Sequence, residues 1–485
     1  MKVKDKALEG LSYNVLLKLL TIILQTVTSI AIAHYLSSTE YGVVAFALVY
    51  INFLTQFGDI GLTSAAVQRE HLSDDSLHTA FTIKLVLGLL LGLIGVGIAL
   101  ALAAGGGRPV AGVLAILSAN FLISSLGFIP QTRLTRALDY RKLAIVQFIA
   151  TLASTVVTVL LLVASFSYWA VALGYTGASV ASVVAFTLLL PAKPRLLMDL
   201  KAGMSFMTFG SVLFMTGLLN FAILNADNFL IGWQAGQSAL GKYALSFNWS
   251  FVATTQVLGI LVSVLFPLYS KIQNDREQLR RLYLRSLEYT AALVMLLNME
   301  LFCFAPQFLY LILGGGTDKW MSALSAFRIL CVDGVVAGLL VPIAPLTVAM
   351  GKPGVMLKAV ALAAAIELVA LVPALKLAGI GGVAVAVTIA GISQYIVYVS
   401  ALRRELQLEW KALLKAVGPA MAGGAVLLAL WGGLFAGRTV AAGWATLVGG
   451  GISFAICFAA IYGACTKWAL YREMAVIYRE RVGLG

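Results

Sequence analysis

The chain has little charge, few cysteines and few histidines. Only 11% of its 485 residues are charged, whereas an ordinary soluble protein has about 25%. The three histidines form no Ser-His-Asp arrangement and no HExxH sequence. The four cysteines fall in or near apolar segments without CxxC spacing, so we interpret them as packing residues and predict no metal site. These scarcities disfavour a soluble enzyme and a metalloenzyme.

Long apolar runs take the place of the missing charge. Hydrophobic residues make up 61% of the chain, and the stretches 85–104 and 420–437 contain no charged residue. About 20 apolar residues are enough for a helix to cross a bilayer core. We therefore predict an all-α, polytopic membrane protein of about fourteen transmembrane helices. They are centred on residues 11–34, 42–66, 79–104, 110–129, 143–165, 168–190, 204–230, 244–268, 286–311, 324–349, 355–375, 380–402, 412–436 and 441–465.

The basic residues set the expected orientation. With the N-terminus inside, 26 of the 34 lysines and arginines fall in cytoplasmic segments and 5 in outside loops. This bias predicts a multi-pass membrane protein with both termini in the cytoplasm. The net charge of +13 thus indicates loops beside anionic headgroups, and we expect no nucleic acid partner.

A weak internal repeat suggests how the spans are grouped. Gly10-Leu11-Ser12-Tyr13 opens the first span, and Gly203-Met204-Ser205-Phe206 opens the seventh. Two six-helix blocks related by an axis along the membrane normal are typical of transporters. We predict an N-terminal six-helix lobe over 1–200, a second six-helix lobe over 201–405, and two additional helices with a cytoplasmic tail over 406–485.

Several short segments then point to a family. They are Leu36-Ser37-Ser38-Thr39-Glu40-Tyr41-Gly42, Gly58-Asp59-Ile60-Gly61-Leu62, Ile129-Pro130, Tyr140-Arg141-Lys142-Leu143-Ala144 and Asn225-Ala226-Asp227-Asn228. In this order and spacing, the chain resembles the polysaccharide transporter (Wzx-type) family of the MOP (MATE-like) superfamily. The resemblance implies a flippase of the bacterial inner membrane that translocates undecaprenyl-diphosphate-linked oligosaccharide by alternating access, for exopolysaccharide or lipopolysaccharide biosynthesis. A polymerase and a chain-length regulator are the partners that it implies.

Polar groups inside the spans are the candidate substrate-binding residues. A charge at the bilayer centre costs about 2.5–3.5 kcal/mol on insertion scales, so each needs a reason. We predict a cationic, hydrated cavity for the diphosphate, although a lysine near a span end can also snorkel to the headgroups. Two of the intramembrane acids have structural alternatives to a binding role. Asp59 would pair with a lysine of the first half or cap a break in its helix, and Asp227 would form a hydrogen bond between spans. The candidates are Lys18, Lys84, Gln25, Asn52, Asp227 and Asn225.

The second half carries the candidate ion-coupling residues, Glu300, Asp333, Glu367 and Arg328. Carboxylates that bind and release H+ or Na+ are what ion-coupled exchange requires, and we expect no other cofactor. The alternatives are that Glu300 lies near the outer interface and that Arg328 and Asp333 form a structural pair.

Two other functions compete with a flippase. A MATE-like exporter of organic cations would have an acidic rather than a basic first-half cavity. A membrane-embedded lipid-linked glycan enzyme would need a catalytic cluster, such as an acidic pair on a cytoplasmic loop. Asp74-Asp75 is the adjacent acidic pair, but with Ser73 it fits a helix N-terminus better. We predict a transporter without a catalytic step.

Overall fold

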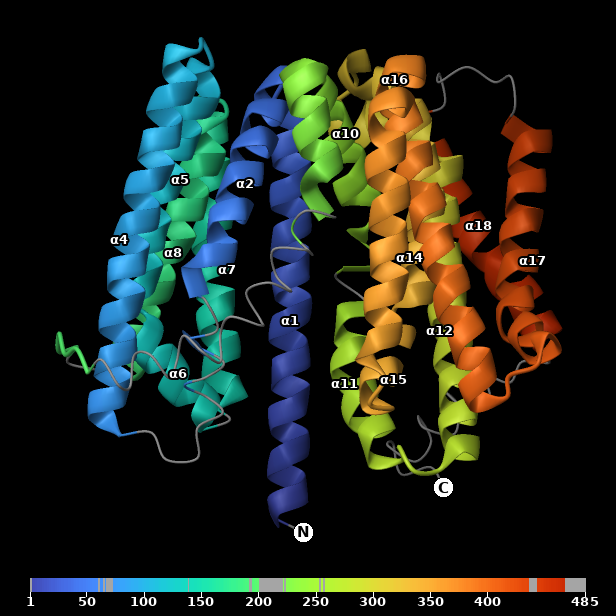
Figure 1. Cartoon of the computed structure of the whole chain (residues 1–485). Helices are drawn as coiled ribbons and strands as arrows, with labels where there is room; N and C mark the ends of the chain where they lie inside the picture. The colour runs from blue at the N-terminus through green and yellow to red at the C-terminus, as the bar shows by residue number, and fades with distance from the viewer. Residues whose placement is uncertain are drawn as a thin grey trace. The chain divides into compact units, whose positions relative to one another are not determined.

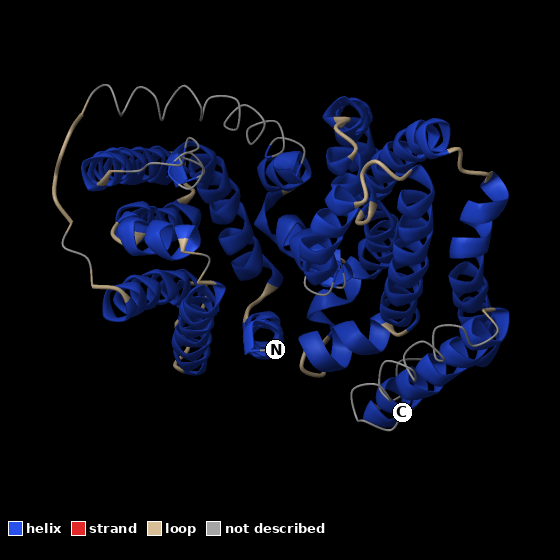
Figure 2. Cartoon of the chain, turned by 90° about the horizontal axis from the view of Figure 1, so that it is seen from below, coloured by secondary structure: helices blue, strands red, loops and turns tan. Residues whose placement is uncertain are grey.

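The computed structural model describes residues 2–59, 62–63, 66, 73–137, 139–191, 194–199, 221, 224–252, 254–255, 258–435 and 443–466. These residues form helices joined by short loops, with no strand among them, as Figure 2 shows. The chain divides into two compact units, Met1–Gly241 and Lys242–Gly485. The predicted all-α membrane architecture is confirmed.

The first unit is built from long helices (Figure 1). α7 packs against α1 and α8, while α5 lies against α2, α4 and α8. Residues 224–234 form a further helical segment, and α10 (Gly236–Ser250) follows it across the unit boundary. The bounds of the earlier helices are α1 (Lys2–Tyr35), α2 (Ser38–Asp59), α4 (Asp74–Ala104), α5 (Arg108–Ser125), α6 (Phe128–Arg136), α7 (Tyr140–Val163) and α8 (Trp169–Leu189).

Side-chain caps fix where two of these helices begin. Ser73 precedes α4, and its side chain accepts a hydrogen bond from the backbone N–H of Ser76. The Asp139 side chain accepts in the same way from the backbone of Lys142 at the start of α7. Each cap satisfies an N–H group that has no partner within its own helix. The predicted N-terminal role of the Ser73 segment is confirmed.

Glycines bring α4 and α5 close together. A Cβ atom at Gly88 would lie 2.6 Å from the Phe121 carbonyl oxygen, and one at Gly95 would lie 2.1 Å from the Ser118 hydroxyl. The opposite face of α4 exposes large apolar side chains, including Leu93 and Leu100. Helices in lipid associate through small residues because their large apolar side chains are equally well solvated by acyl chains. The glycines of α4 therefore mark its protein-facing side.

A connecting segment is fastened to the first turns of α4. The backbone N–H groups of Arg195, Leu197 and Asp199 donate to the side chains of His78, Thr82 and Thr79, respectively. All three acceptors belong to one five-residue stretch of α4, residues 78–82. The segment 194–199, which follows the sixth predicted span, is thus held by side chains rather than by a helix of its own.

The second unit is also helical (Figure 1). α12 packs against α14, α17 and α18, and α14 packs against α16. Tyr269 and Tyr283 are fully buried in its core, where the Tyr269 hydroxyl and Ser286 are 2.7 Å apart. The elements are α11 (Leu258–Lys271), α12 (Arg276–Cys303), α13 (Ala305–Gln307), η2 (Phe308–Leu313), η3 (Asp318–Ala323), α14 (Leu324–Leu340), α15 (Ile343–Ala349), α16 (Pro353–Leu406), α17 (Trp410–Phe435) and α18 (Trp444–Cys465).

α16 contains two spans. Its 54 residues would extend about 80 Å as one straight helix, far beyond a bilayer core of about 30 Å. Ala378 and Gly379 leave the helical conformation, and Gly379 has φ +57°. A Cβ atom at Gly382 would lie 2.2 Å from the Ala374 carbonyl oxygen, so the chain turns back on itself here. The separate spans predicted over 355–375 and 380–402 correspond to the two arms.

The number of spans agrees less closely with the prediction. In the described part of the chain, 11 helices are long and apolar enough to cross a membrane, and one of them is the two-armed α16. The count of fourteen is not confirmed. Most of the seventh predicted span, 204–230, lies outside the described residues, and the eighth, 244–268, falls on α10 and α11. The lobe boundary at residue 200 stays a prediction.

Candidate functional site

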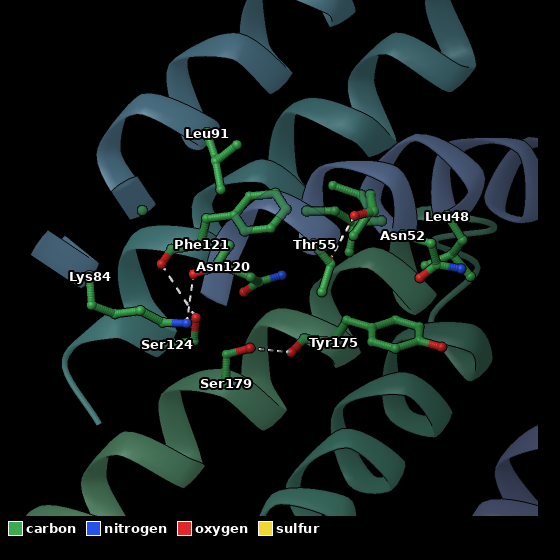
Figure 3. Close-up of a pocket in the computed structure, with 14 residues that line it drawn as sticks. Leu48, Asn52, Thr55, Lys84, Leu91, Asn120, Phe121, Ser124, Tyr175 and Ser179 are labelled. Atoms are coloured by element: carbon green, nitrogen blue, oxygen red, sulfur yellow. Dashed lines mark hydrogen bonds between the residues drawn. The ribbon is translucent and has the colours of Figure 1, made fainter. Parts of the chain in front are cut away.

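A cavity of about 400 Å³ lies among α2, α4, α5 and α8 of the first unit. We call it the first-unit cavity, and Figure 3 shows its wall. Its lining residues are Leu48, Ile51, Asn52, Thr55, Gly58, Lys84, Gly88, Leu91, Leu117, Asn120, Phe121, Ser124, Tyr175 and Ser179.

Helical periodicity explains why these residues share one space. On each of the four helices, the lining residues are mainly three or four positions apart, which places them on one face. On α5, for example, Leu117, Asn120, Phe121 and Ser124 follow one another at this spacing. Each helix thus contributes a single stripe to the wall.

Lys84 is the charged residue among the described residues that line this cavity. Its Nζ donates to the Gly58 carbonyl oxygen at 2.7 Å (Figure 3). Gly58 belongs to the last turn of α2, where carbonyl groups have no partner within the helix and a cation is favoured. The predicted intramembrane lysine therefore holds the end of one helix while its ammonium group forms part of the cavity wall.

Asn120 presents an acceptor without a partner. Its Nδ2 donates to the Thr176 hydroxyl at 3.4 Å, and the buried Oδ1 has no hydrogen-bond partner among the described residues. An unpaired buried carbonyl oxygen is costly unless a ligand or water satisfies it. A hydrogen-bond donor that reached this oxygen from the cavity would satisfy it.

The first-unit cavity brings together two of the six predicted substrate-binding residues, Lys84 and Asn52. Lys18 is exposed on α1 and does not line it. Gln25, on the same helix, has a buried Oε1 without a partner among the described residues. The roles of Lys18 and Gln25 stay predictions.

Asp227 and Asn225 lie on the helical segment 224–234. Asp227 is buried, and its Oδ1 accepts from the Asn228 backbone N–H at 2.6 Å and from the Asn228 side chain at 3.1 Å. The Asn225 amide donates to the Phe221 carbonyl oxygen. Neither lines the first-unit cavity. These contacts are local, and the predicted substrate role of both residues stays a prediction.

Glu300 lies at a separate cavity of about 270 Å³ in the second unit, with Trp249, Phe304 and Phe308 among its neighbours. One carboxylate oxygen, Oε1, is buried and has no hydrogen-bond partner among the described residues. Asp333 and Glu367 are buried on α14 and α16 but do not line this cavity. Of the three predicted coupling acids, Glu300 has an unsatisfied oxygen beside a cavity.

Arg328 is held by aromatic rings. Its guanidinium lies 4.8 Å from the Trp431 ring centroid and 5.5 Å from that of Phe302, and its Nε donates to the Phe302 carbonyl oxygen. Cation–π contacts of this kind stabilise a partly desolvated charge. These contacts with α12 and α17 give Arg328 a structural setting, and its predicted coupling role stays a prediction.

Several site residues escaped the sequence interpretation. Asn120, Ser124, Tyr175 and Ser179 all line the first-unit cavity, yet none was predicted. Asn120 is the carboxamide in the predicted span 110–129, a signal that was available. The predicted acidic pair, in contrast, is at the start of α4, where Asp74 forms a 2.9 Å ion pair with Arg133. The side chain of Asp59 lies outside the described residues.

Known proteins match both the sequence and the fold. The family model described as "Polysaccharide biosynthesis protein" matches residues 31–325. The succinoglycan biosynthesis transport protein ExoT of Rhizobium meliloti (strain 1021) is 26% identical over 69% of this chain and 66% of its own length. The lipopolysaccharide biosynthesis protein WzxC of Escherichia coli (strain K12) is 24% identical over 74% of this chain and 73% of its own.

A solved structure supports the same fold. The lipid II flippase MurJ, in an inward closed conformation, superposes with a TM-score of 0.74 and 15% identity, covering 96% of this chain and 100% of that one. The resemblance inferred from short segments is confirmed, because a family model matches more than half of the chain. The chain belongs to the polysaccharide biosynthesis protein family of Wzx-type transporters.

Proposed function

We propose that the protein is a flippase that moves a polyprenyl-diphosphate-linked oligosaccharide across the bacterial inner membrane by alternating access. The observation that carries this proposal is the first-unit cavity, whose wall combines one lysine with amide, hydroxyl and aromatic groups. Family membership supports the same conclusion. The substrate is the undecaprenyl-linked repeat unit of an exopolysaccharide or lipopolysaccharide, and the chemical structure of that unit is unchanged by transport.

Each group in the cavity has a role in this proposal. The Lys84 ammonium meets the anionic diphosphate, because a charge-assisted hydrogen bond is the strongest contact that this wall offers. The Asn52, Asn120 and Ser124 side chains exchange hydrogen bonds with sugar hydroxyls. Tyr175, which is 47% exposed, supplies an aromatic face. The polyprenyl tail remains in lipid, where its burial is favourable.

The charge of the cavity argues against an exporter of organic cations. Such a transporter needs an acidic group to meet its substrate, and the charge on the described wall is that of Lys84. A cation in a cavity of low dielectric constant repels another cation more strongly than it would in water. The wall therefore favours an anionic substrate.

The second unit supplies the proposed coupling site. A cation or proton bound at Glu300 would satisfy its buried, unpartnered oxygen. We assign the coupling of transport to H+ or Na+ to this carboxylate, with Asp333, Glu367 and Arg328 as further candidates. Both termini are proposed to lie in the cytoplasm, and a polymerase and a chain-length regulator are proposed as partners.

The test is transport by the full chain in proteoliposomes. The substrate is a fluorescent polyprenyl-diphosphate oligosaccharide, and its appearance in the opposite leaflet is measured by accessibility to a membrane-impermeant reagent. Lys84→Met removes one charge-assisted hydrogen bond of about 1.5–3 kcal/mol and should slow transport about 10–100-fold. Asn120→Leu removes a neutral bond of about 0.5–1.5 kcal/mol and should slow it about 2–10-fold.

Matched controls separate the site from general damage. Lys142→Met removes a lysine of the same unit that pairs with Asp139 away from the cavity, and Gln147→Leu removes an exposed amide of α7. Both should transport at the wild-type rate. Wild-type activity in Lys84→Met and Asn120→Leu would refute the role of this cavity, and a chemically altered glycan would point to an enzyme.

A further inference from the structure

A second polar cavity lies in the other unit, at the beginning of α12 and α17 and the end of α18. Its volume is about 1070 Å³, and we call it the basic groove. These three helices pack against one another (Figure 1). The groove shares no residue with the first-unit cavity or with the cavity at Glu300. It is lined by Ile272, Gln278, Arg280, Arg281, Leu282, Leu284, Arg285, Glu288, Ala412, Lys415, Ala416, Pro419, Cys465 and Thr466.

The charge of the groove is positive. Arg280, Arg281, Arg285 and Lys415 line it together with one acid, Glu288. Outside the wall, Glu277 receives 2.9 Å contacts from both Arg280 and Arg281. Glu409 also acts electrostatically on Arg280, so among the described residues four cations face three acids. An anion placed here would be attracted rather than repelled.

Neighbouring groups hold the acidic part of this wall in place. The Tyr462 hydroxyl of α18 donates to Glu288 at 3.4 Å, which turns this carboxylate toward a donor on a neighbouring helix.

The cations of the groove come from two helices. Lys415 belongs to α17 and Arg281 to α12, so their charges converge on one space. Convergent cations on separate elements form a binding site more readily than a charged stripe on one helix, because they surround the ligand.

Most of the remaining wall is apolar, although Gln278 and Thr466 also line it. Leu282, Leu284, Ala416 and Pro419 line the same groove, and Leu414 beside it is 66% exposed. Trp410, at the start of α17, stacks on Arg403 at 4.1 Å, and tryptophan is typical of the membrane–water interface. A free phosphate ion needs no apolar wall. A lipid headgroup with the first methylenes of its chains fits both surfaces.

We propose that the basic groove binds the phosphate headgroup of an anionic membrane phospholipid. The phosphate contacts Arg281, Arg285 and Lys415, and the upper part of the chains lies against Leu284, Ala416 and Pro419. Basic cavities between membrane helices on the cytoplasmic side bind anionic headgroups through such charge complementarity. This site does not depend on the proposed flippase activity, and binding is measurable without transport.

The experiment measures phospholipid binding to the full chain in neutral detergent by native mass spectrometry. Phosphatidylglycerol is titrated in one series, phosphatidylcholine in a second, and inorganic phosphate is added as a competitor in a third. The triple variant Arg281→Gln, Arg285→Gln, Lys415→Gln should bind phosphatidylglycerol about 100-fold more weakly, with each cation contributing about fivefold. Inorganic phosphate should displace little of the lipid.

A matched variant makes the same change in net charge elsewhere. Lys358, Lys376 and Arg404 are exposed basic residues of α16 that do not line the groove. Their triple replacement by glutamine should leave phosphatidylglycerol binding within about threefold of wild type, since headgroup attraction falls off away from the site. Arg281→Lys, Arg285→Lys with Lys415→Arg should keep binding, because the positive charges are retained, and the tryptophan fluorescence of the glutamine variant should match that of the wild type if it is folded.

Four results would overturn the proposal. One is unchanged phosphatidylglycerol affinity in the first triple variant. Another is an equal loss in both glutamine variants, which would indicate a general effect of net charge. The third is binding of phosphatidylcholine as tight as that of phosphatidylglycerol. The fourth is complete displacement by inorganic phosphate, because a specific anionic lipid site allows neither of these last two.

Discussion

Replacing Gly88 with alanine would place a methyl group against the backbone of α5. The new Cβ would lie 2.6 Å from the Phe121 carbonyl oxygen, about 0.7 Å short of a normal C···O contact of about 3.3 Å. A backbone atom cannot rotate away as a side chain can, so α4 and α5 must separate. Overpacking of this kind typically costs about 1–3 kcal/mol.

Gly97 provides the matched control because it lies on the same helix and a Cβ there would meet nothing within 4 Å. Alanine favours a helix over glycine by about 0.5–1 kcal/mol at either position. This gain cancels in a comparison of Gly88→Ala with Gly97→Ala, and the steric cost of about 1–3 kcal/mol remains.

The assay is reversible unfolding in mixed micelles of a mild detergent and sodium dodecyl sulfate, followed by tryptophan fluorescence. Gly88→Ala should have the lower free energy of unfolding by this difference. It should also transport more slowly, since Gly88 lines the first-unit cavity. Equal stability of the two variants would refute the inference that glycine is required for the close approach of these helices.

Three further changes test other parts of the structure. Ser73→Ala removes the side-chain cap of α4 and should lower the free energy of unfolding by about 1 kcal/mol; no change in mixed-micelle unfolding would contradict the cap. Gly379→Val forces a β-branched residue to adopt φ +57°, which should cost about 1–3 kcal/mol. Gly432→Ala lies within α17 where a Cβ meets nothing, so it is the unstrained control and should not lower stability; equal loss of stability in the two would contradict the strained turn. Glu300→Gln removes the exchangeable charge, so transport in proteoliposomes should no longer respond to an imposed proton or sodium gradient. A response equal to that of the wild type would exclude this carboxylate from coupling.

The overall fold was accessible from the sequence because a bilayer imposes one simple rule. Every span must be apolar and about 20 residues long, and the runs are visible at 85–104 and 420–437. The two arms of α16 were also predictable, since 355–375 and 380–402 are separated by a glycine-rich turn. The attachment of residues 194–199 to α4 was not predictable, because it depends on which backbone groups the fold brings to His78, Thr79 and Thr82, and hydropathy does not report this.

The site was accessible only in part. Lys84 was found because a charge inside an apolar run is conspicuous. Asn120 and Ser179 are as important to the wall, but short polar side chains can satisfy themselves on their own helix, as Ser179 does with the Tyr175 carbonyl oxygen. Only the arrangement of helices shows which polar group faces a cavity. Arg328 was also conspicuous as a charge in an apolar run, but the structure shows that the Phe302 and Trp431 rings surround its guanidinium, which the sequence did not reveal.

The attachment of residues 194–199 to α4 has a mechanical consequence. Thr82, which holds the Leu197 amide, is two residues before Lys84 on the same helix. Residues 194–199 are therefore tied to the stretch of α4 that directly precedes the cation, so a displacement of this segment would act on the same helix that positions the Lys84 ammonium group.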